Sequence, residues 1–182
     1  MTLTPLFDPE EHQRPMRVAA FMSGSGTNIM RLLELEKALG AQDGRSPFET
    51  VFIFCDRSDG VSAGEKIALE NGLPYFSYDI RMFHIRNAIK RTVANEEGLA
   101  ARRAYDRMAE TLVKAFHIDI IALGGYMSYA TLGRCVNVHP ADLSLLDSNG
   151  NRKYVGDQAV HDAICAGERV LRSSTLWTDE GV

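Results

Sequence analysis

The sequence predicts an α/β fold of three layers with a mostly parallel, Rossmann-like central sheet. Apolar segments of strand length alternate with segments of helical periodicity along most of the 182 residues. This order is typical of parallel strands joined by right-handed helical crossovers. The chain is also 45% hydrophobic and 24% charged, a composition that indicates a globular domain with a sizeable buried core.

The individual elements follow from apolar runs and from the residues that end them. Strand segments are rich in β-branched and aromatic residues, and the helical segments carry apolar residues on one side. The predicted strands are residues 16–22, 49–55, 75–78, 118–123 and 134–138. The predicted helices are residues 29 to about 39, 62–71, 80–117 with an interruption near 95–98, and 157–166.

Charge, cysteine content and the ends of the chain limit the class of protein. The net charge of -4 gives no general basic field, so we expect no affinity for nucleic acid or anionic membranes. No apolar run reaches the roughly 18 residues of a transmembrane helix. Cys55, Cys135 and Cys165 lack metal-ligand spacing, which predicts reduced, packed thiols in a cytoplasmic protein. Residues 1–15 contain three prolines and are expected to form a flexible arm before a domain at 16–182.

The second half of the long helical segment carries an apolar stripe and three arginines. The stripe consists of Tyr105, Met108, Ala109, Leu112, Val113 and Phe116. This spacing predicts a helix that packs on the sheet. We interpret Arg102, Arg103 and Arg107 as its solvated face.

A glycine-rich run, Ser23 to Asn28, follows the first predicted strand directly. Small residues at a helix N-terminus expose backbone N–H groups that bind anions, and Thr27 or Asn28 can cap the helix. The run lacks the third glycine of a dinucleotide fingerprint and the lysine of a P-loop. We therefore predict a monophosphate site, with a plain glycine-rich turn as the alternative.

Two further motifs follow later strands. After residues 118–123, Gly124 and Gly125 permit the close approach of a flat ligand, and Tyr126 and Met127 offer an apolar wall. The alternative is a tight turn with two core residues. Because ligands of parallel sheets bind at the carboxyl ends of the strands, we expect this motif to share one pocket with the glycine-rich run.

Asn137 and His139 place two polar side chains on one face of the last apolar strand. An amide donor beside an imidazole suits acyl transfer to an amine, in which one group stabilises a developing oxyanion and the other handles the proton. The alternative is a strand end whose side chains bond nearby backbone. We interpret Cys135, on the same strand, as a packing residue.

In this order and spacing, the motifs resemble the formyltransferase family, most closely the glycinamide ribonucleotide formyltransferases of purine synthesis. The resemblance runs from about Met16 to Val182. It includes the runs 22–28, 103–106, 123–127, 136–140, 154–156, 161–164 and 178–182. It implies the three-layer, Rossmann-like formyltransferase fold.

The resemblance also implies an activity and a set of site residues. The implied reaction transfers a formyl group from 10-formyltetrahydrofolate to the amine of glycinamide ribonucleotide. The implied phosphate-binding residues are Gly24, Ser25, Gly26, Thr27 and Asn28. The implied folate-binding residues are Tyr126, Met127 and Val138. The implied catalytic residues are Asn137 and His139. The reaction requires neither a metal nor a covalent enzyme intermediate, and the expected partners are small molecules that bind a monomer or a homodimer.

The chain departs from the family pattern at several points. The family's third catalytic residue, an aspartate, would follow Val182, so we expect the domain to lack its C-terminal part. Residues 141–153 replace a proline-fixed turn with a longer polar loop, and Gln158 and Leu176 stand where histidines are common. Three alternatives remain: hydrolysis of 10-formyltetrahydrofolate, a noncatalytic ligand-binding relative, and a nucleotide-dependent oxidoreductase. The short glycine run before Asp56 argues against the last.

Overall fold

A computed structural model describes residues 5–156 and 158–179 of the chain. The strands are β1 (Met16–Met22), β2 (Phe48–Cys55), β3 (Tyr75–Ser77), β4 (Ile120–Leu123), β5 (Cys135–His139) and β6 (Ser174–Thr178). The helices are α1 (Pro9–His12), α2 (Thr27–Asp43), α3 (Gly64–Glu70), α4 (Ile80–Arg86), α5 (Glu96–Ala115) and α6 (Ala159–Cys165). The strand order is β3-β2-β1-β4-β5-β6. The chain forms two compact units, Met1–Cys135 with Thr178–Val182 and Val136–Trp177.

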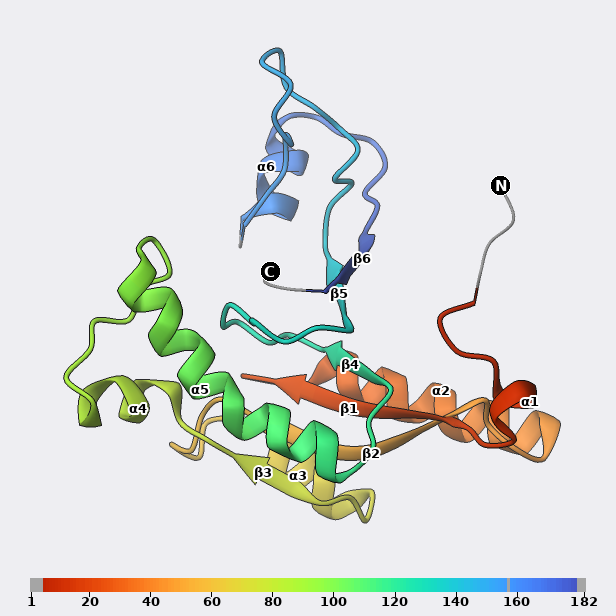
Figure 1. Cartoon of the computed structure of the whole chain (residues 1–182). Helices are drawn as coiled ribbons and strands as arrows, with labels where there is room; N and C mark the ends of the chain where they lie inside the picture. Colours follow the sequence, from red (N-terminus) through yellow and green to blue (C-terminus); the bar gives the residue numbers. More distant parts are fainter. Residues whose placement is uncertain (1–4, 157, 180–182) are drawn as a thin grey trace. The chain divides into compact units, whose positions relative to one another are not determined.

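The first unit is built on a parallel sheet (Figure 1). Strand β1 pairs in parallel with β2 on one side and with β4 on the other, and β2 pairs in parallel with β3. The chain therefore moves outward in one direction from β1 to β3 and then returns to the opposite side of β1. Strand order reverses at this point, where open parallel sheets place their ligand sites. The predicted α/β class with a mostly parallel sheet is confirmed.

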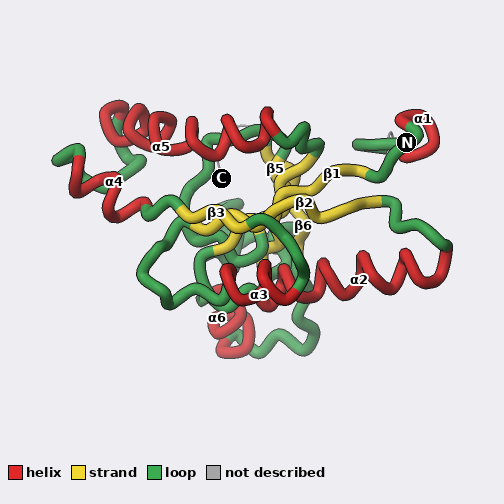
Figure 2. Tube along the Cα trace, turned by 90° about the horizontal axis from the view of Figure 1, so that it is seen from below, coloured by secondary structure: helices red, strands yellow, loops and turns green. Residues whose placement is uncertain are grey.

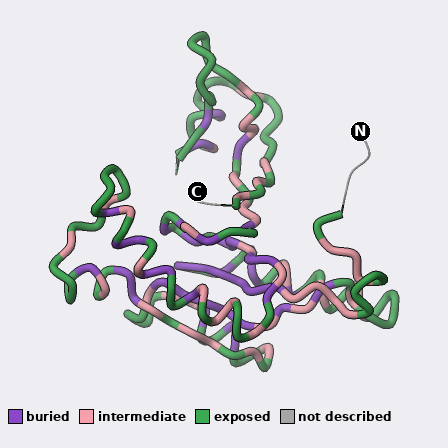
Figure 3. The backbone as a smooth tube through the Cα atoms, in the orientation of Figure 1, coloured by how far each residue is buried: buried purple, intermediate pink, exposed green. Residues whose placement is uncertain are grey.

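Helices cover both faces of this sheet. Figure 2 shows α2 and α3 on one face and α5 on the other. Alternation along the strands supplies the two faces, because Ala20, Met22 and Ile53 pack with residues of α2 and α3, whereas Phe21 and Phe52 pack toward α5. Strands β1, β2 and β4 are accordingly deeply buried (Figure 3). No helix in the described part of the chain is long and apolar enough to cross a membrane.

The apolar stripe of α5 packs much as its spacing predicts. Tyr105 and Ala109 are buried, and Leu112, Val113 and Phe116 pack against the core beneath them. Met108 differs, since it is 48% exposed. A stripe that is inferred from spacing alone includes such residues at its border, where the helix surface turns away from the sheet.

The interpretation of Arg102 as part of a solvated face is wrong. Its side chain is only 3% exposed, and it pairs with Asp106 one turn later. The Arg102 guanidinium donates from Nε and Nη2 to the two oxygens of Asp106 at 2.9 and 2.7 Å. Nη2 also donates to the hydroxyl of Tyr126 at 3.0 Å. Among the described residues, Nη1 of Arg102 has no hydrogen-bond partner, so the buried charge is compensated by Asp106 and by the contact with Tyr126.

Asp106 also ties α5 to the loop that follows β4. The backbone N–H and the hydroxyl of Thr131 both donate to Oδ2 of Asp106, at 2.8 and 2.7 Å. The same carboxylate therefore accepts from the helix and from the loop that carries Tyr126. Asp106 fixes the loop on which the predicted apolar wall lies.

The N-terminal segment that was expected to be a flexible arm includes α1. Asp8 caps this single turn by accepting from the backbone N–H of Glu10. Arg14 donates to Asp119 from both of its terminal nitrogens, at 2.5 and 2.9 Å. The carboxylate of Asp119 also accepts from the backbone N–H of Arg17, so this contact reaches the start of β1.

The second unit has a small core of its own. Buried Ala141, Tyr154, Ala159 and Ala163 pack together. The polar loop predicted at 141–153 is present and contains one isolated antiparallel bridge between Leu146 and Arg152. The predicted helix at 157–166 corresponds to α6, and its first residue, Asp157, lies outside the described residues. The strand β6 has no counterpart among the predicted elements.

We predict that Asp106→Ala lowers the free energy of unfolding by about 3–5 kcal/mol, because it leaves the buried Arg102 charge without a partner. Urea unfolding followed by circular dichroism measures this. Glu110→Ala on the same helix is the matched control, since Glu110 forms an exposed i,i+4 pair with Lys114 and should cost less than about 0.5 kcal/mol. Equal effects of the two variants would contradict the prediction.

Candidate functional site

A pocket of about 520 Å³ lies where β1, β2 and β4 end in the first unit. The whole predicted phosphate-binding run, residues 24–28, lines it. Gly124, Gly125 and Met127, from the turn after β4, line it as well. The structure thus brings together two of the three motifs that the sequence singled out.

The glycine-rich run forms a turn that opens α2 toward the pocket. Gly26 has φ +68° and is the N-cap residue, and no side chain caps the helix. A methyl group on Gly26 would lie 2.5 Å from Cδ1 of Ile67 and 2.7 Å from Cε of Met22 and would push these side-chain ends aside. The positive φ is the stronger reason for glycine at this position. The first-turn N–H groups of a 17-residue helix remain available to an anion.

Backbone and hydroxyl hydrogen bonds hold this run against the turn after β4. The N–H of Ser23 donates to the carbonyl of Gly125 at 3.1 Å, and the N–H of Met127 donates to the hydroxyl of Ser23 at 2.9 Å. On the other side, the N–H of Ala63 donates to the carbonyl of Gly24 at 3.1 Å. These three bonds fix the loop before any ligand binds.

Three arginines line the same pocket and were not predicted as site residues. Arg57 follows β2, Arg81 lies in the first turn of α4, and Arg91 lies between α4 and α5. Guanidinium groups bind phosphate and carboxylate groups through paired N–H donors. Their place in the sequence could have indicated this role, because Arg57 follows β2 and Arg81 and Arg91 follow β3. Both segments share the carboxyl edge of the sheet with the glycine-rich run.

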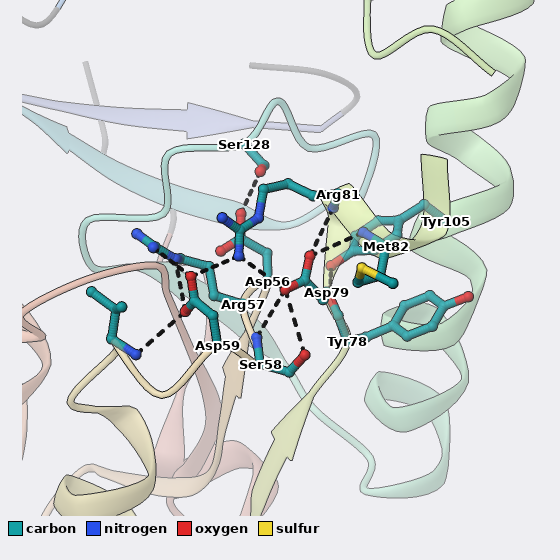
Figure 4. A network of polar contacts seen from close by, with 11 residues as sticks. Asp56, Arg57, Ser58, Asp59, Tyr78, Asp79, Arg81, Met82, Tyr105 and Ser128 are labelled. Atoms are coloured by element: carbon teal, nitrogen blue, oxygen red, sulfur yellow. Dashed lines mark hydrogen bonds and ion pairs between the residues drawn. The ribbon is translucent and has the colours of Figure 1, made fainter. Parts of the chain in front are cut away.

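Two of these arginines are already neutralised by carboxylates (Figure 4). Arg57 donates to Asp59 at 2.7 and 3.3 Å. Arg81 donates to Asp59 at 2.6 Å and to Asp79 at 3.2 Å. The hydrogen bond from Arg57, followed by that from Arg81, holds the pKa of Asp59 below its usual range. Asp59 therefore remains ionised and paired at neutral pH.

Asp79 joins the start of α4 to the loop after β2. Burial alone would raise its pKa, but hydrogen bonds from the Arg81 side chain and from the N–H groups of Met82 and Ser58 outweigh that effect and lower the pKa to about 2. Asp79 is also the N-cap of α4, where a carboxylate interacts favourably with the helix dipole. The arginine side of the pocket is thus a fixed ion-pair network.

Tyr126 and Met127 have different surroundings. Tyr126 is 9% exposed, belongs to the core under α5, and lies edge-on to Phe21 at 5.6 Å between ring centroids. Burial raises the pKa of its hydroxyl. Met127 is 63% exposed and lines the pocket. Of the two predicted wall residues, Met127 is the one whose side chain is open to a ligand, and folate binding by either stays a prediction.

Asn137 and His139 lie on β5, in the second unit. Both are partly buried, whereas Val138 between them is 47% exposed. Nε2 of His139 lies 3.1 Å from the carbonyl oxygen of Tyr154. A carbonyl oxygen only accepts, so Nε2 carries a proton, and in the neutral imidazole the lone pair is on Nδ1. Such a bond orients structural and catalytic histidines alike.

Comparisons with known proteins indicate a family. No family model matches the chain. The trifunctional purine biosynthetic protein adenosine-3 of Drosophila melanogaster is 28% identical over 177 residues, covering 93% of this chain and 11% of that protein. A solved phosphoribosylglycinamide formyltransferase from Coxiella burnetii is 21% identical with a TM-score of 0.62, covering 91% of this chain and 67% of that chain. The chain is thus similar in sequence to the trifunctional protein and similar in fold to the phosphoribosylglycinamide formyltransferases.

The formyltransferase fold predicted from the sequence is confirmed by this likeness. A solved N10-formyltetrahydrofolate-dependent formyltransferase of pyoverdin biosynthesis is also similar, with 14% identity, a TM-score of 0.54, and coverage of 91% of this chain and 78% of that chain. The chain spans only 11% of the length of the Drosophila melanogaster protein.

Cys135 is a packing residue, as its sequence context predicted. Its thiol is buried, and burial raises its pKa to about 12. The thiol lies 3.4 Å from the carbonyl oxygen of Leu132. A neutral, buried thiol is a poor nucleophile at physiological pH. The prediction of a packed thiol is wrong for Cys165, which is exposed on α6.

We predict that Gly26→Ala lowers the free energy of unfolding by about 1–3 kcal/mol, because alanine is strained at this φ and its methyl group meets Ile67 and Met22. Gly24→Ala is the matched control, since a methyl group there has no atom within 4 Å, and it should change stability by less than about 0.5 kcal/mol. Chemical denaturation of both variants measures the difference. A destabilised Gly24→Ala would contradict this account of the loop.

We further predict that one thiol reacts rapidly with a disulfide reagent at pH 8, and that it is Cys165. Cys55 and Cys135 are buried and should react only after unfolding in guanidinium. Absorbance at 412 nm with Ellman's reagent measures the rates. Rapid reaction that persists in Cys165→Ser would overturn the prediction.

Proposed function

We propose that this chain binds the phosphate of a ribonucleotide in the pocket of the first unit and takes part in formyl transfer to its amine, with glycinamide ribonucleotide as the acceptor. The observation that supports this is the uncapped start of α2, which faces a pocket lined by glycines and arginines. Neutral N–H donors at a helix N-terminus and nearby guanidinium groups together select a small anion. The pocket has the size of a small-molecule site.

The formyl donor that we propose is 10-formyltetrahydrofolate, which when bound supplies the one-carbon group that the acceptor amine receives. Met127 fits this assignment, because it presents an exposed apolar side chain beside two glycines on the pocket lining. A flat pteridine requires an apolar wall and close backbone approach. Val138, which is also exposed, is the second apolar residue that we propose to contact the folate.

Asn137 and His139 are the residues that we propose to act on the reacting atoms. The amide of Asn137 would donate to the formyl oxygen as it gains negative charge, which stabilises the tetrahedral intermediate. His139 has a free lone pair on Nδ1, since Nε2 donates to Tyr154. It would accept the proton that the acceptor amine loses as its new bond to carbon forms, and return it to the nitrogen of the departing folate.

The experiment is formyl transfer measured with purified chain, glycinamide ribonucleotide and 10-formyltetrahydrofolate, together with calorimetric affinities for each ligand. We expect Asn137→Ala to lower kcat by about 10²- to 10³-fold while the nucleotide Kd changes less than twofold. His139→Ala should lower kcat in the same way, and His161→Ala is the control, because His161 is an exposed histidine on α6.

The outcomes separate the alternatives. Formate release that does not require the nucleotide would identify a hydrolase. Tight binding of both ligands without turnover would identify a noncatalytic relative. Absence of affinity for both ligands would contradict the proposed function altogether.

A further inference from the structure

Three segments of the first unit meet in a hydrogen-bonded chain beside the pocket. Asp56 follows β2, Ser128 lies in the turn after β4, and Arg91 lies between α4 and α5. The hydroxyl of Ser128 donates to Oδ2 of Asp56, a contact that Figure 4 shows from close by. Nη2 of Arg91 donates to the same hydroxyl at 3.2 Å.

The direction of these bonds is fixed by chemistry. A serine hydroxyl has one proton and can accept as well. Because an ionised carboxylate only accepts and a guanidinium only donates, the Ser128 proton points to Asp56 and its lone pair points to Arg91. Asp56 and Ser128 are 3% and 7% exposed, so this arrangement is held in the protein interior. It fixes the end of the Arg91 side chain, which is otherwise exposed.

Arg91 differs from the other two arginines of the pocket. Arg57 and Arg81 are paired with Asp59, and Arg81 with Asp79 as well. Within residues 5–156 and 158–179, Arg91 forms no ion pair with a carboxylate closer than 4.0 Å. The hydroxyl of Ser128 lies between Arg91 and the carboxylate of Asp56. Arg91 is therefore the pocket guanidinium whose charge a ligand can still use directly.

The start of α2 needs such a cation to bind a dianion. A helix N-terminus carries a positive charge of only about one half, and the first turn of α2, residues 27–30, contains no basic residue. A phosphomonoester carries close to two negative charges at pH 7.5. A second, full positive charge at the pocket matches a phosphomonoester better than a carboxylate or a phosphodiester.

We propose that Arg91 is a specificity-determining residue that binds the phosphomonoester held by the glycine-rich run, and that Asp56 and Ser128 are positioning residues that act through Arg91. This proposal rests on the proposed function, because it names the residue that completes the same phosphate site. Arg91 selects acceptors that carry a terminal phosphate over acceptors that carry a single negative charge.

The first test measures binding by calorimetry at pH 7.5, with glycinamide ribonucleotide and with ribose 5-phosphate as the minimal probe. We expect Arg91→Ala to weaken both affinities about tenfold or more, and Arg91→Lys to recover part of the loss, since a charged hydrogen bond to phosphate is removed and then partly replaced. Arg86→Ala is the matched control, because Arg86 is an exposed arginine of α4 that is not among the pocket residues.

The second test separates positioning from a general structural effect. We expect Ser128→Ala to weaken nucleotide binding in the wild-type background and to have no further effect in Arg91→Ala. Ser128→Thr keeps the hydroxyl and should retain the affinity. Thermal unfolding of each variant, measured in parallel, identifies variants that fail to fold. An additive effect of Ser128→Ala in the Arg91→Ala background would overturn the positioning role.

The outcomes distinguish this proposal from the proposed function. Wild-type chain that binds neither phosphomonoester would overturn both. Wild-type binding that Arg91→Ala leaves unchanged would overturn only the role of Arg91. A loss confined to affinity for a folate analogue would also overturn it, since Arg91 would then serve an anionic group of the formyl donor.

Discussion

The parallel pairing of β1 with both β2 and β4 is the constraint on which the pocket depends. Because strand order reverses at β1, the run after β1 and the turn after β4 leave the sheet side by side. Gly124 makes this possible, since a methyl group there would lie 2.2 Å from Cδ1 of Ile29 in the first turn of α2. A side chain at this position would displace Ile29 from its place against the end of β4. Hydrogen bonds from Ser23 and Met127 then fix the two turns.

Most of the arginines around this pocket are paired with carboxylates. Asp59 and Asp79 neutralise Arg57 and Arg81, and the low pKa of Asp79 reflects how firmly that network is held. Fixed ion pairs of this kind shape a pocket without adding net attraction for a ligand. The remaining attraction comes from backbone N–H groups at the start of α2 and from a guanidinium that a buried acid positions through one hydroxyl.

The second unit contains His139, whose ring is oriented by a backbone carbonyl. It has a small core around Tyr154, and the backbone carbonyl of the same residue determines which nitrogen of His139 is protonated. A backbone carbonyl accepts hydrogen bonds at every pH, so it holds the imidazole ring of His139 in one orientation. This link between core and imidazole suits either a structural or a catalytic histidine, and it gives the proposed proton transfer a defined nitrogen.

The sequence by itself determined the fold class, nearly all strand positions, and the turns that line the pocket. It could do so because period-two alternation, glycine runs and apolar stripes are local signals that survive in a single chain. Tertiary structure alone decided that Arg102 is buried with Asp106, that Tyr126 is a core residue while Met127 is open, and that Arg91 reaches Ser128. The contacts of Arg102 with Tyr126 and of Arg91 with Ser128 join residues that are 24 and 37 positions apart. Such contacts form only when the crossovers bring different strand ends to one edge of the sheet.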